Sequence, residues 1–193
     1  MYVRAAKNRD ELWLLDQIEA LGVDEAAFRS RDYVIAIDEE TNAKAGFGRI
    51  RLHKTEEAEY CELTSLGVLE EYRGGGVGAH IVERLVENAR DQEFEEIFAF
   101  EVGDGYMEQF GFEPVPADDL PPVLDGRLDE KRELVDEEAE PLKLDVAAFE
   151  MPADKRNAFK QAGGEDEEPE VVETPEDFGI DPDTATYKYD TGR

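Results

Sequence analysis

The sequence is poor in the residues that build disulfides and metal centres. Cys61 is the only cysteine among 193 residues, so the chain cannot form an internal disulfide or a zinc site built from several thiolates. The two histidines, His53 and His80, stand apart from any paired-carboxylate pattern. We therefore expect no metal centre.

Long hydrophobic runs are also missing. A transmembrane helix needs about 18 or more consecutive apolar residues, and no such run occurs. The opening residues, MYVRAAKNRDE, contain no apolar core of the kind found in export signals. The sequence thus predicts a cytoplasmic protein that is neither exported nor inserted into a membrane.

Positive charge is scarce. Lysine and arginine number 21 against 50 acidic residues, which gives a formal net charge of -29 spread along the chain. Such a field repels nucleic acids and anionic lipids, because their binding depends on cations that neutralise phosphates, and we exclude both as main partners. A globular protein this acidic, with only eight lysines, is typical of halophilic proteins, although an ordinary acidic protein is the alternative.

Apolar residues recur with periods typical of alternating strands and helices. Strands are expected at residues 2–6, 33–37, 45–53, 60–69 and 97–102, and helices at about 9–21, 23–30 and 78–89. A short helix at 104–111 and a helical insert at 123–134 should accompany extended pieces at 112–115 and 142–146.

This order predicts an α/β protein of the α+β type, with a mixed, mostly antiparallel central sheet flanked by helices. Three strands in meander order precede the helix at 78–89, and the strand after that helix should run parallel to the strand before it. Residues 1–150 form the predicted domain. Residues 151–193 are acidic and proline-containing, which predicts a disordered tail, with a docking or regulatory segment as the alternative.

A glycine-rich loop follows the third meander strand. Four of the five residues from Gly74 to Gly78 are glycine, and the loop leads directly into a helix, an arrangement suited to phosphate binding. A P-loop is excluded because Ala79 and His80 stand where Lys and Ser or Thr are needed. A purely structural turn is the alternative without a ligand.

A dinucleotide fingerprint is formally present in the same loop. Gly74, Gly76 and Ala79 satisfy its spacing, and Glu101 follows at a suitable distance for a ribose-binding acid. However, residues 70–73 separate the strand from the first glycine, and an antiparallel meander precedes the motif. These features argue against a doubly wound nucleotide-binding fold.

Two motifs resemble the GNAT superfamily of acetyl-CoA-dependent N-acetyltransferases. The first, R-x-x-G-x-G, is formed by Arg73, Gly76 and Gly78 within LGVLEEYRGGGVG. The second, YMEQFGFEPV, begins at Tyr106 and is similar to a motif near the C-terminus of that fold. The resemblance covers roughly residues 1–150.

The resemblance implies an acyltransferase that moves an acetyl group from acetyl-CoA, as cosubstrate, to a primary amine by direct attack on the thioester. In that family, amides of the glycine loop hold the CoA pyrophosphate, and the end of the preceding strand pairs with the pantetheine arm. The implied cofactor-binding residues are Leu66, Gly67, Val68, Arg73, Gly74, Gly75, Gly76, Val77, Gly78 and Ala79.

Glu62 and Tyr106 are the candidate catalytic residues. Strand alternation places Glu62 on one face with Thr64, Leu66 and Val68, at the offset of the general base in some family members. A solvent-facing acidic residue is the alternative. The usual proton-donating tyrosine of the second motif is Met107 here, so Tyr106 is the candidate acid, with core packing as the alternative.

The acceptor is the least constrained part of the prediction. The run GFEPVPADDLP resembles small amino-acid N-acetyltransferases, and the carboxylate of an amino acid would need a cation, for which Arg49 and Arg51 are candidates. Either arginine could instead pair with a carboxylate of the protein. Polyamine or protein-amine acceptors, a homodimer, and a catalytically silent acetyl-CoA-binding module that acts through its tail are left open.

Overall fold

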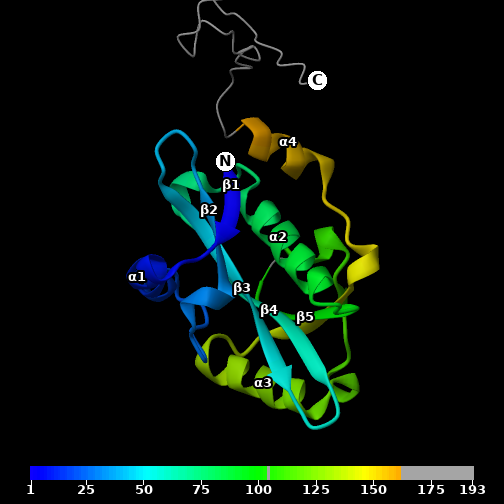
Figure 1. The fold of residues 1–193 in the computed structure, drawn as a ribbon. Helices are drawn as coiled ribbons and strands as arrows, with labels where there is room; N and C mark the ends of the chain where they lie inside the picture. The colour runs from blue at the N-terminus through cyan, green and yellow to red at the C-terminus, as the bar shows by residue number, and fades with distance from the viewer. Residues whose placement is uncertain (104, 162–193) are drawn as a thin grey trace, which may run out of the picture.

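The computed structural model describes residues 1–103 and 105–161, and the predictions for 162–193 lie outside the described residues. Figure 1 shows the fold. Its strands are β1 Tyr2–Ala5, β2 Tyr33–Ile37, β3 Lys44–Lys54, β4 Glu59–Val68, β5 Glu96–Glu101, β6 Glu113–Pro114 and β7 Glu140–Asp145. Its α-helices are α1 Glu11–Leu21, α2 Val77–Asp91, α3 Pro122–Leu134 and α4 Ala153–Gln161.

Within the described residues, seven strands form one mixed sheet in the order β1-β2-β3-β4-β5-β7-β6. Strands β1 to β4 pair in antiparallel fashion with their sequence neighbours, whereas β4 and β5, joined by α2, are parallel. This confirms the predicted fold class and the strand-helix-strand unit around the glycine loop. The glycine loop follows the end of β4 and leads into α2, so it lies at the edge of the sheet where this parallel pair ends.

The helices cover both faces of the sheet. Alternate side chains of a strand point to opposite faces, so Val34 packs in the core under α2 while its neighbour Ile35 packs under α1. Helix α3 covers the α1 face further along the sheet, where Leu124 and Leu128 meet Phe98 of β5. In Figure 1, α3 lies at the bottom of the view, and α4 lies at the top beside the first turn of α2.

The helix expected at residues 23–30 is wrong. This segment is a loop that ends in a single 3-10 turn at Ser30–Asp32, and Ala27 has a left-handed φ of 52°. The carbonyl oxygens of Ala26 and Ala27 accept hydrogen bonds from the buried guanidinium of Arg49. A side chain of β3 therefore satisfies loop carbonyl groups that a helix would have paired internally.

The short motif segments are also less regular than predicted. The helix expected at 104–111 is one 3-10 turn at Glu108–Phe110, and the extended piece at 112–115 contains only β6, which pairs with β7. Gly111 takes a left-handed φ of 92° immediately after the turn, which ends it.

Helix α4 lies inside the stretch that was expected to be a disordered tail. Phe159 packs against the core under α2, so the first residues of this stretch bury apolar surface. Along the described parts of the chain, no helix combines the length and apolar character needed to span a membrane.

Candidate active site

The parallel strands β4 and β5 separate at the centre of the sheet. Pairing between them is limited to three residue pairs, from Cys61 with Ile97 to Leu63 with Ala99, although β4 continues to Val68. Beyond Leu63, the β4 edge that faced β5 is therefore no longer paired with it. This divergence opens a space between the two strands.

A β-bulge lies on β4 at the same level. Arg49 of β3 pairs with Thr64 and Phe47 pairs with Gly67, so one residue of β3 faces two residues of β4, Ser65 and Leu66. Ser65 has a left-handed φ of 52°. A bulge leaves backbone groups of the ladder unpaired and turns the following side chains.

The bulge reverses the side-chain alternation of β4, so the prediction that Glu62, Thr64, Leu66 and Val68 share a face is wrong. Before the bulge, Glu62 and Thr64 contact polar side chains that include Arg127 and Asp24. After it, Leu66 and Val68 pack against the α2 core on the other face. Period-two reasoning cannot anticipate an inserted residue.

A cavity of about 390 Å³, here called the strand cavity, occupies the space between the separated strands. Its walls come from β4, the end of β5, the loop after α1, the segment before the 3-10 turn at Glu108–Phe110, and the end of α3. The lining residues are Gly22, Val23, Asp24, Leu63, Thr64, Ser65, Leu66, Ala99, Phe100, Glu101, Val102, Tyr106, Met107, Lys131, Val135 and Asp136.

A second cavity, of about 300 Å³ and here called the glycine cavity, lies at the glycine loop. It is lined by Leu66, Val68, Tyr72, Arg73, Gly74, Gly76, Val77, Gly78, Tyr106 and Lys155. The predicted residues Gly67, Gly75 and Ala79 do not line it. Gly67 faces Phe47 on the α1 side, and Ala79, in the first turn of α2, is fully buried in the core.

The glycine loop has the conformation that its composition suggested. Gly74 and Gly76 have φ of 81° and 75°, and α2 begins at Val77, so the unpaired amides of its first turn lie at the glycine cavity. The Nε atom of Arg73 donates to the carbonyl oxygen of Val68 at 3.1 Å, which ties the loop to the end of β4.

Leu66 and Tyr106 line both cavities. The Tyr106 ring packs edge-on against Phe110 with centroids 5.4 Å apart, and a Cβ atom added to Gly78 would lie 2.7 Å from the Tyr106 hydroxyl. Burial, with a smaller effect of Glu101, raises the pKa of Tyr106 to about 12. The phenol is therefore protonated near neutral pH and stands as a donor between the two cavities.

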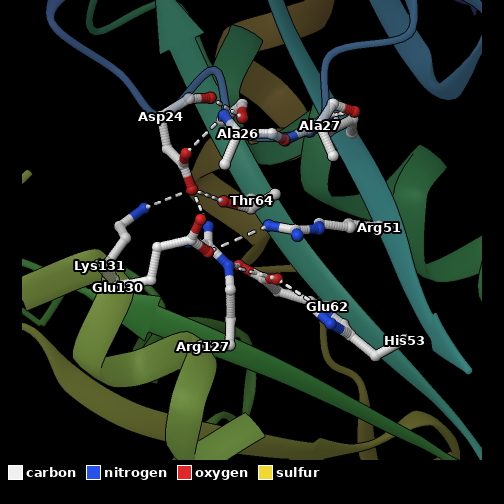
Figure 2. Close-up of polar contacts among 12 residues, drawn as sticks. Asp24, Ala26, Ala27, Arg51, His53, Glu62, Thr64, Arg127, Glu130 and Lys131 are labelled. Carbon is white, nitrogen blue, oxygen red and sulfur yellow. Dashed lines mark hydrogen bonds and ion pairs between the residues drawn. The ribbon is translucent and has the colours of Figure 1, made fainter. Parts of the chain in front are cut away.

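A buried ionic network lies behind the strand cavity (Figure 2). The Nε atom of Arg127 on α3 donates to both carboxylate oxygens of Glu62, at 3.2 and 3.1 Å, and its terminal nitrogens reach Asp24 and Glu130. His53 Nε2 lies 2.7 Å from Glu62 Oε2. The network joins α3 and the loop after α1 to strands β3 and β4.

Lys131 is the cation of this network that lines the strand cavity. Its Nζ atom lies 3.7 Å from Asp24 Oδ2, a loose ion pair, while Asp24 is also held by Arg127. Burial lowers the pKa of Lys131 to about 8, and Glu62 partly opposes this shift. Across the cavity, burial raises the pKa of Glu101, whose Oε1 accepts a 2.9 Å hydrogen bond from the Met107 amide.

A family model described as Acetyltransferase (GNAT) family matches residues 4–112. The chain belongs to this family. It is therefore an acyltransferase. The matched residues contain the bulged strand, the glycine loop and Tyr106, whereas α3, β7 and α4 follow the matched part. No curated protein sequence matches this chain significantly.

Solved structures support the GNAT fold at low sequence identity. N-acetylglutamate synthase from Neisseria gonorrhoeae, complexed with coenzyme A and N-acetyl-glutamate, is 19% identical with a TM-score of 0.61, covering 75% of this chain. This chain spans only 35% of that enzyme. Rv2747 from Mycobacterium tuberculosis, in complex with CoA and NLQ, is 16% identical with a TM-score of 0.62, covering 75% of this chain and 98% of that one.

A third similar structure is Arabidopsis thaliana Naa50, in complex with a bisubstrate analogue that contains CoA. It is 16% identical with a TM-score of 0.53, and the alignment covers 74% of this chain and 96% of that one. At these identities the three likenesses show a shared fold.

The structure brings only some of the predicted site residues of this GNAT acetyltransferase to the cavities. Arg49 is fully buried against the Tyr33 ring and the loop after α1, and Arg51 pairs with Glu130 at 3.6 Å. Neither arginine lines the strand cavity. Glu62 lines neither cavity and is fully buried with Arg127 and His53, so its role as a general base stays a prediction.

Sequence reasoning missed Arg127 and Lys131 of α3. Both are buried beside Leu124 and Leu128 on the inward face of the helix. Two cations four residues apart on an apolar helix face are a recognisable signal, because buried cations need acidic partners or a ligand.

Proposed function

We propose that this GNAT acetyltransferase transfers an acetyl group from acetyl-CoA to the primary amine of a free amino acid. The observation that carries the proposal is that the strand cavity and the glycine cavity meet at Leu66 and Tyr106. A donor in one cavity and an acceptor in the other would therefore react beside a single phenol and a bulged strand.

The glycine cavity fits the phosphate and pantetheine parts of acetyl-CoA. Its loop offers backbone amides at a helix N-terminus, and Gly78 leaves room beside Tyr106 that any larger residue would fill. Past Leu63, β4 is no longer paired with β5, so its backbone can pair with the pantetheine amides. The similar N. gonorrhoeae and M. tuberculosis structures contain CoA, which supports this donor.

Acetyl-CoA supplies an activated thioester carbonyl, and the residues of the chain must place the amine and manage protons. A backbone N–H at the Ser65 bulge is suited to donate to the carbonyl oxygen as that oxygen gains negative charge, because a bulge leaves groups of the ladder without a strand partner. Tyr106 is protonated and can give its proton to the departing sulfur. Glu101 lines the strand cavity beside Tyr106 and is placed to receive the proton of the acceptor ammonium.

The strand cavity carries charges of both signs, as a zwitterionic acceptor requires. Lys131 faces it from α3, and Glu101 and Asp136 face it from other walls. Lys131 thereby takes the role in carboxylate binding that the sequence suggested for Arg49 or Arg51. The presence of N-acetyl-glutamate in the similar N. gonorrhoeae structure supports an amino-acid acceptor.

The acceptor site predicts a specific effect of replacing Lys131. A charge-assisted hydrogen bond contributes about 1.5–3 kcal/mol, so Lys131→Met should raise the KM for an amino-acid acceptor by roughly 10- to 100-fold and leave the KM for acetyl-CoA within about twofold. Steady-state kinetics with each substrate varied in turn measure both constants. An unchanged acceptor KM would contradict the carboxylate contact.

The lowered pKa of Lys131 adds a pH test. Lys131 loses its charge above about pH 8 in the free enzyme, so kcat/KM for the acceptor should fall above that pH. Burial is the main cause of the lowered pKa; Glu62 opposes the shift, whereas Arg127 and Arg49 add to it, and Asp24 is the acidic group closest to Nζ, at 3.7 Å. Lys131→Arg keeps its charge and should remove the fall, and a profile that is identical in both proteins would argue against Lys131.

Replacing Glu101 and Glu62 in turn shows which of the two carboxylates acts as the general base. Burial raises the pKa of Glu101, so the base form is present above this raised pKa and kcat/KM should rise with pH through it. Glu101→Gln should lower kcat by roughly 100-fold or more and abolish this rise. If Glu62→Gln abolishes the rise and Glu101→Gln does not, the base is Glu62, as the sequence predicted.

The proposed function is tested by following thiol release from acetyl-CoA with each of the common amino acids and with amines that lack the carboxylate. The assay is run in both dilute buffer and molar KCl, and products are identified by mass spectrometry. We expect an N-acetylated amino acid to form faster than any acetylated simple amine. CoA binding without turnover would favour a silent binding module, and absence of CoA binding would reject the donor.

A further inference from the structure

Helix α4 packs directly on the glycine loop. A Cβ atom at Gly76 would collide with the carbonyl oxygen of Lys155 and lie 3.0 Å from the backbone nitrogen of Phe159. The backbone of α4 thus contacts the last glycine before α2. Figure 1 shows α4 beside the start of α2. Because α4 follows the part matched by the GNAT family, this contact is a feature of this chain's own C-terminal segment.

Side chains on both helices hold α4 in this position. The Phe159 ring stacks on His80 with centroids 3.8 Å apart and an interplanar angle of 26°. Arg156 pairs with Glu83 one turn further along α2, at 3.0 Å. Burial lowers the pKa of His80, so the stacked imidazole is neutral near pH 7. The apolar stack and the ion pair fix the helix beside the loop.

This placement brings Lys155 to the wall of the glycine cavity. Among the residues that line the cavity, the cations are Arg73 and Lys155. Arg73 already donates from Nε to the Val68 carbonyl. Among the described residues, Lys155 pairs with its neighbour Asp154 at 3.4 Å, and the Asp154 side chain is 72% exposed. An exposed pair of this kind is weak, so it does not prevent Lys155 from binding an anion.

Local cations matter more here than in an average protein. The formal net charge of -29 repels a ligand that carries several phosphate charges. Backbone amides alone offer partial charges, whereas a lysine offers a full charge at short range. A cation supplied by α4 would offset the repulsion at the place where the phosphates must enter.

We infer that α4 is part of the donor site and that Lys155 binds a phosphate group of acetyl-CoA beside the glycine loop. The inference rests on the proposed acetyl-CoA donor. It assigns a binding role to the first residues of a stretch that the sequence marked as an acidic tail.

Binding of CoA, 3′-dephospho-CoA and pantetheine to the full-length protein tests this inference. Lys155→Ala should raise the Kd for CoA about tenfold in dilute buffer, less in molar KCl, and leave pantetheine binding unchanged because pantetheine has no phosphate. Lys155→Arg should restore most of the affinity. If Lys155→Ala weakens binding of CoA but not of 3′-dephospho-CoA, Lys155 contacts the 3′-phosphate. If it weakens binding of both, Lys155 contacts the pyrophosphate.

Lys143→Ala is the matched control, because Lys143 pairs with Glu96 on the sheet and lines neither cavity. An unchanged CoA Kd in Lys155→Ala, with normal binding by the parent protein, would overturn the role of Lys155 and leave the donor intact. Failure of the parent protein itself to bind CoA would instead overturn the proposed function and this inference together.

Two glycine substitutions test the docking of α4 separately. Gly74 and Gly76 both have left-handed φ values, so an alanine is strained at either position, but only at Gly76 would its Cβ meet α4. Hydrogen exchange at residues 153–161 should accelerate at least tenfold in Gly76→Ala and stay near the parent rate in Gly74→Ala. Equal exchange in the two variants would show that α4 does not dock on the loop.

Discussion

Replacing Arg127 by alanine is expected to lower the free energy of unfolding by about 3–5 kcal/mol. Arg127 is only 3% exposed, and its guanidinium contacts the carboxylates of Asp24, Glu62 and Glu130. Its removal would leave the buried charges of Asp24 and Glu62 without this partner, and few water molecules could reach them. In a chain of this size, the loss corresponds to a fall in Tm of roughly 6–20 °C.

Chemical denaturation followed by circular dichroism measures this effect, with Arg84→Ala as the control. Arg84 pairs with Glu87 at 3.2 Å on the exposed face of α2, and such surface pairs contribute about 0–1 kcal/mol. The Arg127 variant should lose several times more stability than the Arg84 variant in dilute and in concentrated salt, because buried pairs are poorly screened. Similar losses in the two variants would show that the network does not hold α3 to the sheet.

Replacing Tyr106 by phenylalanine is expected to lower kcat by about 100-fold or more and to leave the KM for acetyl-CoA nearly unchanged. The ring would keep its edge-on contact with Phe110, while the hydroxyl at the junction of the two cavities would be lost. General acids contribute roughly 10²- to 10⁴-fold to rates. Because the pKa of Tyr106 is about 12, the loss should be the same from pH 6 to 9.

An alternative acyl donor makes this test specific. A p-nitrophenyl ester has a leaving group that needs no proton, so the defect of the Tyr106 variant should shrink markedly with such a donor. Tyr60→Phe is the control, since Tyr60 packs against Phe98 and lines neither cavity. A defect of equal size with both donors would assign Tyr106 to packing, the alternative reading of its sequence position.

Local sequence patterns predicted the sheet because the elements that form it follow one another closely along the chain. The hairpin of β2 and β3, the glycine loop and α2 each depend on periodicity or on glycine content within a short segment. The parallel pairing of β4 with β5 follows from the intervening helix. Phosphate-loop chemistry could therefore be inferred before any tertiary contact was known.

The acceptor side could not be predicted in this way, because it is assembled from distant segments. The Ser65 bulge turns Leu66 away from Glu62, and no local pattern marks the extra residue. Arg127 contacts Asp24, which lies 103 residues away along the sequence. The helix that carries Arg127 also brings Lys131 to the strand cavity, whereas Arg49 does not line it. The sequence did not predict α4 because the helix docks on Gly76, where the absence of a side chain lets the α4 backbone approach, and this contact is distant in sequence.

In the proposed mechanism, the two cavities form one site in which donor and acceptor meet at Tyr106 and Leu66. The most direct test is the affinity of a conjugate in which CoA is joined through an acetyl link to the amino group of the best amino-acid acceptor. A site shared by the two substrates predicts that this conjugate binds at least about 100-fold more tightly than CoA and competes with both substrates, since linking two ligands that occupy adjoining sites adds their binding energies. A conjugate that binds no more tightly than CoA and competes only with acetyl-CoA would contradict it.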